Sequence, residues 1–243
     1  MNVLAIDTST WSLALGLMAE DRLLGEYNTT LAKNHSLRLM PAISELFNHV
    51  DMTPKELDGI AVAHGPGSYT GVRIGLTTAK SMAWSLGIPI ASLSSLQVVA
   101  QNAYGFQGKI IPLFDARRGQ AYIGVYETSP SEQIVKPVEA DRLEPITKFL
   151  AHLDHMDGPF LFLGEGVQVH EPVIVEMLGE RAQIAPSIYH APRGGQLAYL
   201  AVKTWNEHVR DVHGLAPRYL QLAEAEKKWL SKQESKSGES GES

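Results

Sequence analysis

Alternating blocks of apolar and polar residues predict the elements of the first part of the chain. Continuous apolar runs between short polar turns indicate strands, and apolar side chains that recur every three or four residues indicate amphipathic helices. We expect three strands, a helix, a strand, a helix, a strand and a helix, covering 3–7, 12–19, 22–30, 34–50, 59–64, 71–86, 88–93 and 94–105. The stripe of the first helix that we expect to face the core is Leu37, Met40, Ile43, Leu46, Phe47 and Val50.

The same order of elements starts again near residue 107. Strands are predicted over 109–115, 120–127 and 132–139, followed by a helix over 145–153, a strand over 159–164 and a helix over 167–178. In each half the first strand ends in an acid, Asp7 or Asp115, and the strand before the second helix runs into a Gly-x-Gly turn. The pattern indicates a structural duplication.

Two βββαβα halves predict an α/β protein of the actin-like (ribonuclease H-like) architecture, in which two related domains face each other across a cleft. We expect an N-terminal half over 1–106 and a smaller C-terminal half over 107–192. An amphipathic helix near 194–210 is expected to pack back on the first half. The polar, low-complexity tail 231–243 is predicted to be disordered.

A glycine-rich segment, HGPGSYTGVRIG at 64–75, stands at the start of the helix predicted over 71–86. It lacks the lysine of a Walker A loop, the third glycine of a dinucleotide fingerprint and the spacing of a nucleophile elbow. Two interpretations stay open: an anion site at a helix N-terminus, or a close-packed turn built on Gly65, Gly67 and Gly71. Arg73 opposes the helix dipole, so we expect it to have a partner.

The turn after the first strand reads Asp7-Thr8-Ser9-Thr10. It has the acid and hydroxyls of a phosphate-binding turn in actin-like proteins but no glycine. The equivalent turn of the second half, which begins at Asp115, also departs from that pattern. We interpret these turns as a vestigial nucleotide site, and Asp7 has either a structural role or a retained ligand role.

Composition limits the classes of function. The 243 residues carry a net charge of −6, which argues against a protein that grips nucleic acid alone through a broad basic face, and there is no cysteine. His-Glu-x-x-His is absent, and His152 with His155 is the nearest approach to a metal pair. We predict no metal and no cofactor. No apolar run approaches the length of a membrane span, no signal peptide is evident, and a cytoplasmic location is expected.

Four segments together resemble the bacterial TsaB (YeaZ) family: LAIDTST at 4–10, HSLRLMPAISELF at 35–47, VAHGPGSYTGVRIGLTTAK at 62–80 and DARRGQAYIGVY at 115–126. The third is the most specific, because family members typically carry GPGSFTGLRIG there. The resemblance extends to PRYLQ at 217–221 and is weaker through 128–192.

The resemblance implies a non-catalytic subunit of the machinery that makes N6-threonylcarbamoyladenosine at position 37 of ANN-decoding tRNAs. It implies that the chain pairs with TsaD, which carries the metal and transfers the threonylcarbamoyl group, and works with the ATPase TsaE. It also implies self-association through the same helical surface, and tRNA contacts made mainly through the complex.

The helices predicted over 35–50 and 71–86 are long and broadly apolar, so we expect them to form the partner surface. The residues expected there are His35, Leu39, Met40, Arg73, Lys80 and Trp84. Two other classes stay open. An ATP-dependent kinase or acyl-transferring enzyme would bind ATP–Mg tightly, and a metallohydrolase would contain a transition metal.

Overall fold

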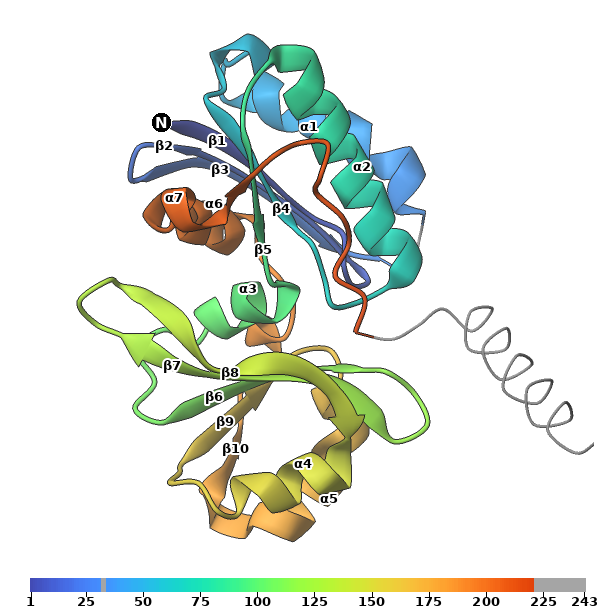
Figure 1. Cartoon of the computed structure of the whole chain (residues 1–243), viewed down its shortest axis with the longest axis vertical. Helices are drawn as coiled ribbons and strands as arrows, with labels where there is room; N and C mark the ends of the chain where they lie inside the picture. Colours follow the sequence, from blue (N-terminus) through green and yellow to red (C-terminus); the bar gives the residue numbers. More distant parts are fainter. Residues whose placement is uncertain (32–33, 221–243) are drawn as a thin grey trace, which may run out of the picture.

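The computed structural model describes residues 1–31 and 34–220, so the tail prediction for 231–243 lies outside the described residues. Two β-sheets lie one above the other along the long axis of the molecule (Figure 1). The first has the strand order β11-β5-β4-β1-β2-β3. Its strands are β1 (Asn2–Asp7), β2 (Ser12–Ala19), β3 (Arg22–Thr30), β4 (Gly59–Ala63), β5 (Ile90–Leu93) and β11 (Val209–Arg210).

The second sheet repeats the topology of the first. Its order is β10-β9-β6-β7-β8, in which β6, β7 and β8 form an antiparallel meander and β9 and β10 extend the sheet in parallel from β6. In the first sheet β1, β2 and β3 form the same meander, and β4 and β5 extend it in parallel. The strands are β6 (Lys109–Asp115), β7 (Gln120–Ser129), β8 (Ile134–Pro145), β9 (Phe160–Leu163) and β10 (Ala182–Ile184). The predicted α/β class and actin-like order of elements are confirmed.

Helices cover both faces of the first sheet. Leu4 and Ile6 of β1 pack with α1 (His35–His49) and α2 (Tyr69–Leu86) on one face. Val3 and Ala5, which alternate with them, pack against α6 (Gly194–Lys203) on the other. The backbones of α6 and β2 touch so closely that a Cβ atom on Gly194 would lie 2.1 Å from the carbonyl oxygen of Leu15.

Helix α3 (Ser95–Gln101) connects the two halves and lies between the two sheets (Figure 1). Its Leu96 and Val99 belong to a buried cluster with Ile110 and Tyr126 of the second sheet. The far face of that sheet is covered by α4 (Ile146–Leu153) and α5 (Val167–Leu178). Three 3₁₀ turns complete the fold, at Pro54–Glu56, Gly179–Arg181 and Ser187–Tyr189.

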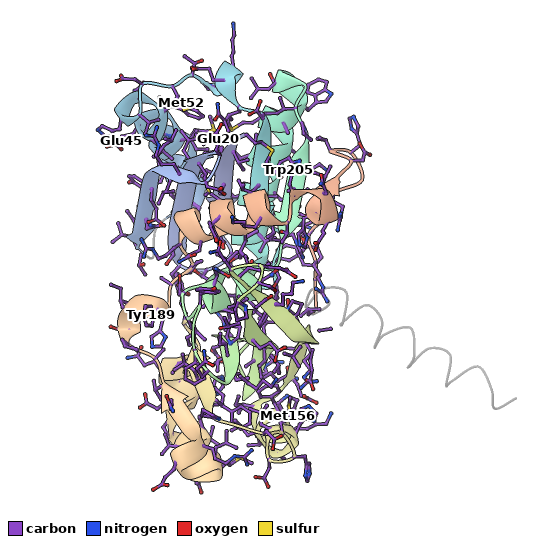
Figure 2. All side chains as sticks on the ribbon, turned by 90° about the vertical axis from the view of Figure 1, so that its left-hand side faces the viewer. Glu20, Glu45, Met52, Met156, Tyr189 and Trp205 are labelled. Carbon is purple, nitrogen blue, oxygen red and sulfur yellow. The ribbon has the colours of Figure 1, made fainter. Side chains whose placement is uncertain are left out.

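The helix predicted near 194–210 is interrupted. Helix α6 ends at Lys203, Thr204 leaves helical geometry with φ of −119°, and a short α7 (Trp205–His208) leads into β11. The Trp205 ring fills the space beside Gly59, where an added Cβ would lie 2.2 Å from the ring (Figure 2). Tertiary packing therefore overrides the helical periodicity and sends the chain to the sheet edge beside β5.

Beyond β11 the chain crosses α2 and returns toward the space between the halves (Figure 1). We call residues 211–219 the C-terminal strap. Lys80 Nζ on α2 donates to the carbonyl oxygens of His213 and Leu215, at 3.2 and 2.7 Å. The backbone N–H of Arg218 donates to the carbonyl of His64 at the end of β4, at 2.9 Å. These bonds hold the strap against the first half.

Candidate functional site

The glycine-rich segment forms a tight turn that is packed against the turn after β1. The N–H of Ser68 donates to the carbonyl of Ser9 at 2.6 Å, and Thr8 Oγ1 donates to the carbonyl of Gly71 at 2.7 Å. A Cβ on Gly67 would lie 2.3 Å from the Ser9 carbonyl oxygen, and one on Gly71 would lie 2.1 Å from the Thr8 carbonyl oxygen. The close-packed interpretation of these glycines is therefore the one that the contacts support.

Ser68 caps the N-terminus of α2, because its Oγ accepts from the N–H of Gly71 at 3.3 Å. We expect Ser68→Ala to lower the free energy of unfolding by about 1 kcal/mol, which lowers Tm by roughly 2–4 °C in a chain of this size. Thermal unfolding followed by circular dichroism measures the shift. Ser81→Ala, at an exposed position in the interior of the same helix, is the matched control and should not lower Tm. Equal Tm values for Ser68→Ala and the parent would contradict the capping role.

Asp7 is buried at the end of β1. Its Oδ1 accepts from the N–H of Ser9 at 2.8 Å, and its Oδ2 has no hydrogen-bond partner among the described residues. Burial raises the pKa of the Asp7 carboxyl to about 6, the hydrogen bonds from Ser9 oppose that rise, and the nearby charge of Glu165 adds to it. Asp7 is thus a carboxyl group that folding makes hard to ionise.

Glu165 joins the two halves at this point. It lies in the Gly-x-Gly turn of the second half, between β9 and α5, and its Oε2 accepts from the N–H of Trp11 at 3.3 Å. Its Oε1 accepts from Ser12 Oγ at 3.4 Å. The backbone N–H groups of the turn after β1 therefore donate to two carboxyl groups of the chain itself, those of Asp7 and Glu165. A phosphate bound at this turn would need the same N–H groups.

The equivalent turn in the second half repeats the hydrogen bond of Asp7 but has different neighbours. Asp115 Oδ1 accepts from the N–H of Arg117 at 3.0 Å and lies 3.3 Å from Nε2 of His170, a buried residue on α5. Arg117 and Arg118 both have positive φ angles, 66° and 54°. Residues 1–31 and 34–220 contain no group of three or more His, Asp, Glu or Cys side chains placed to hold a metal ion.

The surface of α1 differs from the predicted stripe. Leu39 is buried in the core, and Leu37 and Met40 are 72% and 51% exposed. The predictions that Leu39 lies on the partner surface and that Leu37 and Met40 face the core were wrong. The helix is rotated so that Leu39, Ala42 and Leu46 face the sheet. His35, at the start of α1, donates from Nε2 to the carbonyl of Thr10 at 2.9 Å and so ties the helix to the turn after β1.

Helix α2 carries the other exposed groups. Trp84 near its end is 70% exposed and Tyr69 at its start is half exposed. We call Leu37, Met40, Tyr69 and Trp84 the helix-pair patch, since all lie on two helices that cover the same face of the first sheet. Exposed large apolar side chains on two neighbouring helices are typical of an interaction surface.

Arg73 has its partner within the chain. Its Nε donates to the Tyr219 hydroxyl at 2.5 Å, and its guanidinium lies 4.0 Å from the centre of the Tyr69 ring. The Tyr69 and Tyr219 rings stack at 5.0 Å. The sequence indicated that Arg73 needs a partner, but nothing in the spacing pointed to a tyrosine 146 residues away.

The fold is that of an actin-like protein. Two mixed sheets have the same meander and parallel extensions, a central helix joins them, and Glu165 of the second half bonds to the first half. The chain belongs to the TsaB family. It is 47% identical over 233 residues to the Bacillus subtilis "tRNA threonylcarbamoyladenosine biosynthesis protein TsaB", a match that covers 96% of this chain and 100% of that protein.

A family model, a second relative and a solved structure are also similar to this chain. Residues 26–229 match the family model described as "TsaD: tRNA N6-adenosine threonylcarbamoyltransferase". The Escherichia coli protein of the TsaB name is 28% identical over 147 residues, 56% of this chain and 63% of that protein. The solved structure "YeaZ from Pseudomonas aeruginosa" superposes with a TM-score of 0.74 at 26% identity, covering 90% of this chain and 99% of that one. None of the described helices is long and apolar enough to cross a bilayer.

Proposed function

We propose that this chain is a non-catalytic subunit that pairs with TsaD and supports threonylcarbamoyl transfer to adenosine 37 of ANN-decoding tRNAs. The observation that carries the proposal is the state of the turn after β1. The N–H groups of Ser9 and Trp11 donate to the carboxyl groups of Asp7 and Glu165. The carbonyl of Ser9 accepts from the glycine turn, and that of Thr10 accepts from His35. A turn occupied in this way supports a structural role better than phosphate binding.

The helix-pair patch is the surface that we assign to TsaD. Leu37, Met40 and Trp84 expose apolar area that a partner helix would bury. In the absence of TsaD, the same patch supports a homodimer. TsaE and tRNA join through the assembled complex, in keeping with the acidic net charge of this chain. A cytoplasmic location follows from this role.

Reconstitution tests the proposed function. Purified TsaD, TsaE, threonylcarbamoyl-adenylate synthase, ATP and tRNA are incubated with and without this protein, and threonylcarbamoyladenosine is measured in nucleoside digests of the tRNA. We expect formation to depend on this protein. Unchanged modification in its absence would show that the assignment is wrong.

The buried Asp7, with one oxygen unpartnered among the described residues, is the observation that favours an ATP-dependent enzyme instead. That function predicts tight ATP–Mg binding by the isolated chain and turnover that is lost in Asp7→Ala. The subunit proposal predicts neither. Calorimetric titration of ATP–Mg into the purified protein separates the two.

A further inference from the structure

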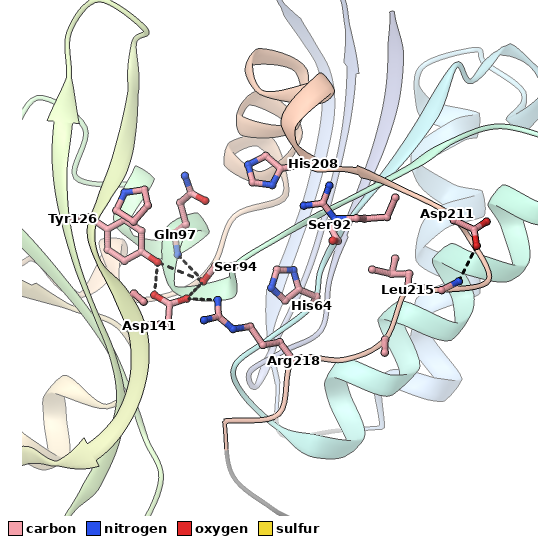
Figure 3. A pocket seen from close by; sticks show the side chains of 15 residues that line it. His64, Ser92, Ser94, Gln97, Tyr126, Asp141, His208, Asp211, Leu215 and Arg218 are labelled. Atoms are coloured by element: carbon pink, nitrogen blue, oxygen red, sulfur yellow. Dashed lines mark hydrogen bonds and ion pairs between the residues drawn. The ribbon is translucent and has the colours of Figure 1, made fainter.

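A cavity of about 810 Å³ lies between the two halves, beside the carboxyl ends of β4 and β5 (Figure 3). Its walls come from the ends of β4 and β5, the start of α3, strands β7 and β8, and residues 208–218. Its volume is in the range of small-molecule sites, roughly 300–1,000 Å³. No residue of the helix-pair patch lines it.

One wall of the cavity carries a buried carboxylate. Asp141 on β8 accepts from the Tyr126 hydroxyl and from Ser94 Oγ, each at 2.5 Å. These bonds fix the carboxylate, and each oxygen retains a lone pair for a further donor. Arg218 of the strap reaches toward it, with Nη1 at 3.9 Å from Oδ2, the outer limit of an ion pair.

The opposite wall carries basic groups. His64, at the end of β4, points into the cavity beside Arg218, and its Nδ1 has no hydrogen-bond partner among the described residues (Figure 3). Burial lowers the pKa of His64 to about 4, and the charges of Arg218, His208 and Arg210 contribute to that change. All three groups therefore act on the same small region. Asp211 also lines the cavity, and its Oδ2 accepts from the N–H of Gly214 at 3.1 Å.

We propose that this cavity binds a small phosphomonoester with a hydroxylated carbon skeleton. The phosphate lies beside Arg218, with His64 Nδ1 as a further hydrogen-bond partner. Arg210, whose Nη1 donates to the carbonyls of Glu207 and Val209, adds positive charge to the same region. A hydroxyl group of the ligand donates to the fixed carboxylate of Asp141. Arginine suits a phosphate because its planar guanidinium donates two parallel hydrogen bonds. The described cavity lining offers a carboxylate on one wall and basic groups on the other. It therefore suits a ligand that has both a hydroxyl group to donate and a phosphate to accept.

Isothermal titration calorimetry on the full chain tests the site, with ribose 5-phosphate, AMP, inorganic phosphate and ribose as probes. We expect ribose 5-phosphate to bind more tightly than phosphate or ribose, because only it engages both walls. Binding of AMP at least as tight as that of ribose 5-phosphate identifies the ligand as a nucleotide, and weaker AMP binding identifies a sugar phosphate. Both compounds share the proposed chemistry.

Three variants locate the binding. Arg218→Ala should weaken ribose 5-phosphate binding roughly ten- to hundredfold, since it removes charged hydrogen bonds. Ala140→Trp places a large uncharged ring at the exposed edge of the cavity lining and should also weaken binding. Arg22→Ala, at an exposed position outside the cavity, is the control and should leave binding unchanged.

Absence of binding by all four probes at millimolar concentration would overturn the proposal. So would binding that persists in Ala140→Trp, which would place the ligand elsewhere on the chain. The site does not depend on the proposed function, because these titrations use the isolated protein and contain no TsaD.

Discussion

Replacing Met40 and Trp84 together with glutamate is expected to abolish pairing with TsaD and leave the monomer folded. Both side chains are more than half exposed and neither belongs to a core cluster, so the change costs the free chain little stability. In a complex the two carboxylates would be buried without partners, and affinity should fall on the order of 100-fold or more. Co-purification with tagged TsaD measures pairing, and circular dichroism reports folding.

The matched control is Val169→Glu with Val175→Glu. These valines on α5 are also exposed, 62% and 49%, and lie on the second half. The control introduces the same two charges and should leave pairing intact. Leu39→Glu is unsuitable as an interface variant, because Leu39 lies in the core and the change would unfold the first half. Survival of pairing in Met40→Glu with Trp84→Glu would mean that TsaD binds elsewhere.

Asp7→Asn is expected to stabilise the protein at neutral pH. Between the ordinary pKa of 3.8 and the native value of about 6, the unfolded chain has lost the Asp7 proton and the folded chain retains it. Stability therefore falls as pH rises through this window and stays reduced above it, by about 3 kcal/mol. Asparagine cannot ionise, and its Oδ1 can still accept from the N–H of Ser9, so the variant escapes this cost.

Urea denaturation at two pH values measures the effect. The stability of Asp7→Asn relative to the parent should be about 2 kcal/mol more favourable at pH 7.5 than at pH 4.5. Asp157→Asn, which removes one exposed carboxylate, controls for the loss of a negative charge. A stability difference between Asp7→Asn and the parent that does not change between the two pH values would contradict the raised pKa of Asp7.

His64 adds a second pH dependence to the free energy of unfolding that the same urea experiment measures. Its pKa falls from an ordinary value of 6.5 to about 4, so the unfolded chain takes up a proton there first as pH falls. Stability from this group is complete above pH 6.5 and is lost as pH falls toward 4. The slopes of Asp7 and His64 oppose each other between those limits. Asp7→Asn should therefore lose stability on acidification more steeply than the parent.

Periodicity predicted most of the fold because most elements bury one regular face. The meanders, the helices and the duplication were predictable from the apolar runs and the repeated acid at Asp7 and Asp115. Strand β10, with three residues, carried too little signal, and β8 extends to Pro145 where polar residues hid it. The break at Thr204 depends on Trp205 packing beside Gly59, a contact that local sequence does not encode.

The candidate site was predictable in part. Residues 64–75 do not fit the known phosphate-binding or nucleophile motifs, which favoured a packing role for the glycines. The contacts of Gly67 and Gly71 agree with that role. The rotation of α1 was not predictable, because Leu37, Leu39 and Met40 are all apolar and only the sheet decides which one is buried. Glu165, the Tyr219 bond to Arg73 and the Asp141 cavity depend on residues far apart in the chain, and no spacing rule connects them.

The first sheet is completed by the last strand that the structure describes. Strand β11 pairs with β5, and α6 covers the face of Val3 and Ala5, so the second half is inserted between two parts of the first. On the ribosome, the N-terminal strands must wait for about 200 residues of synthesis before that face is covered, at roughly 5–20 residues per second. A chain released before α6 is made would therefore leave the face of Val3 and Ala5 uncovered.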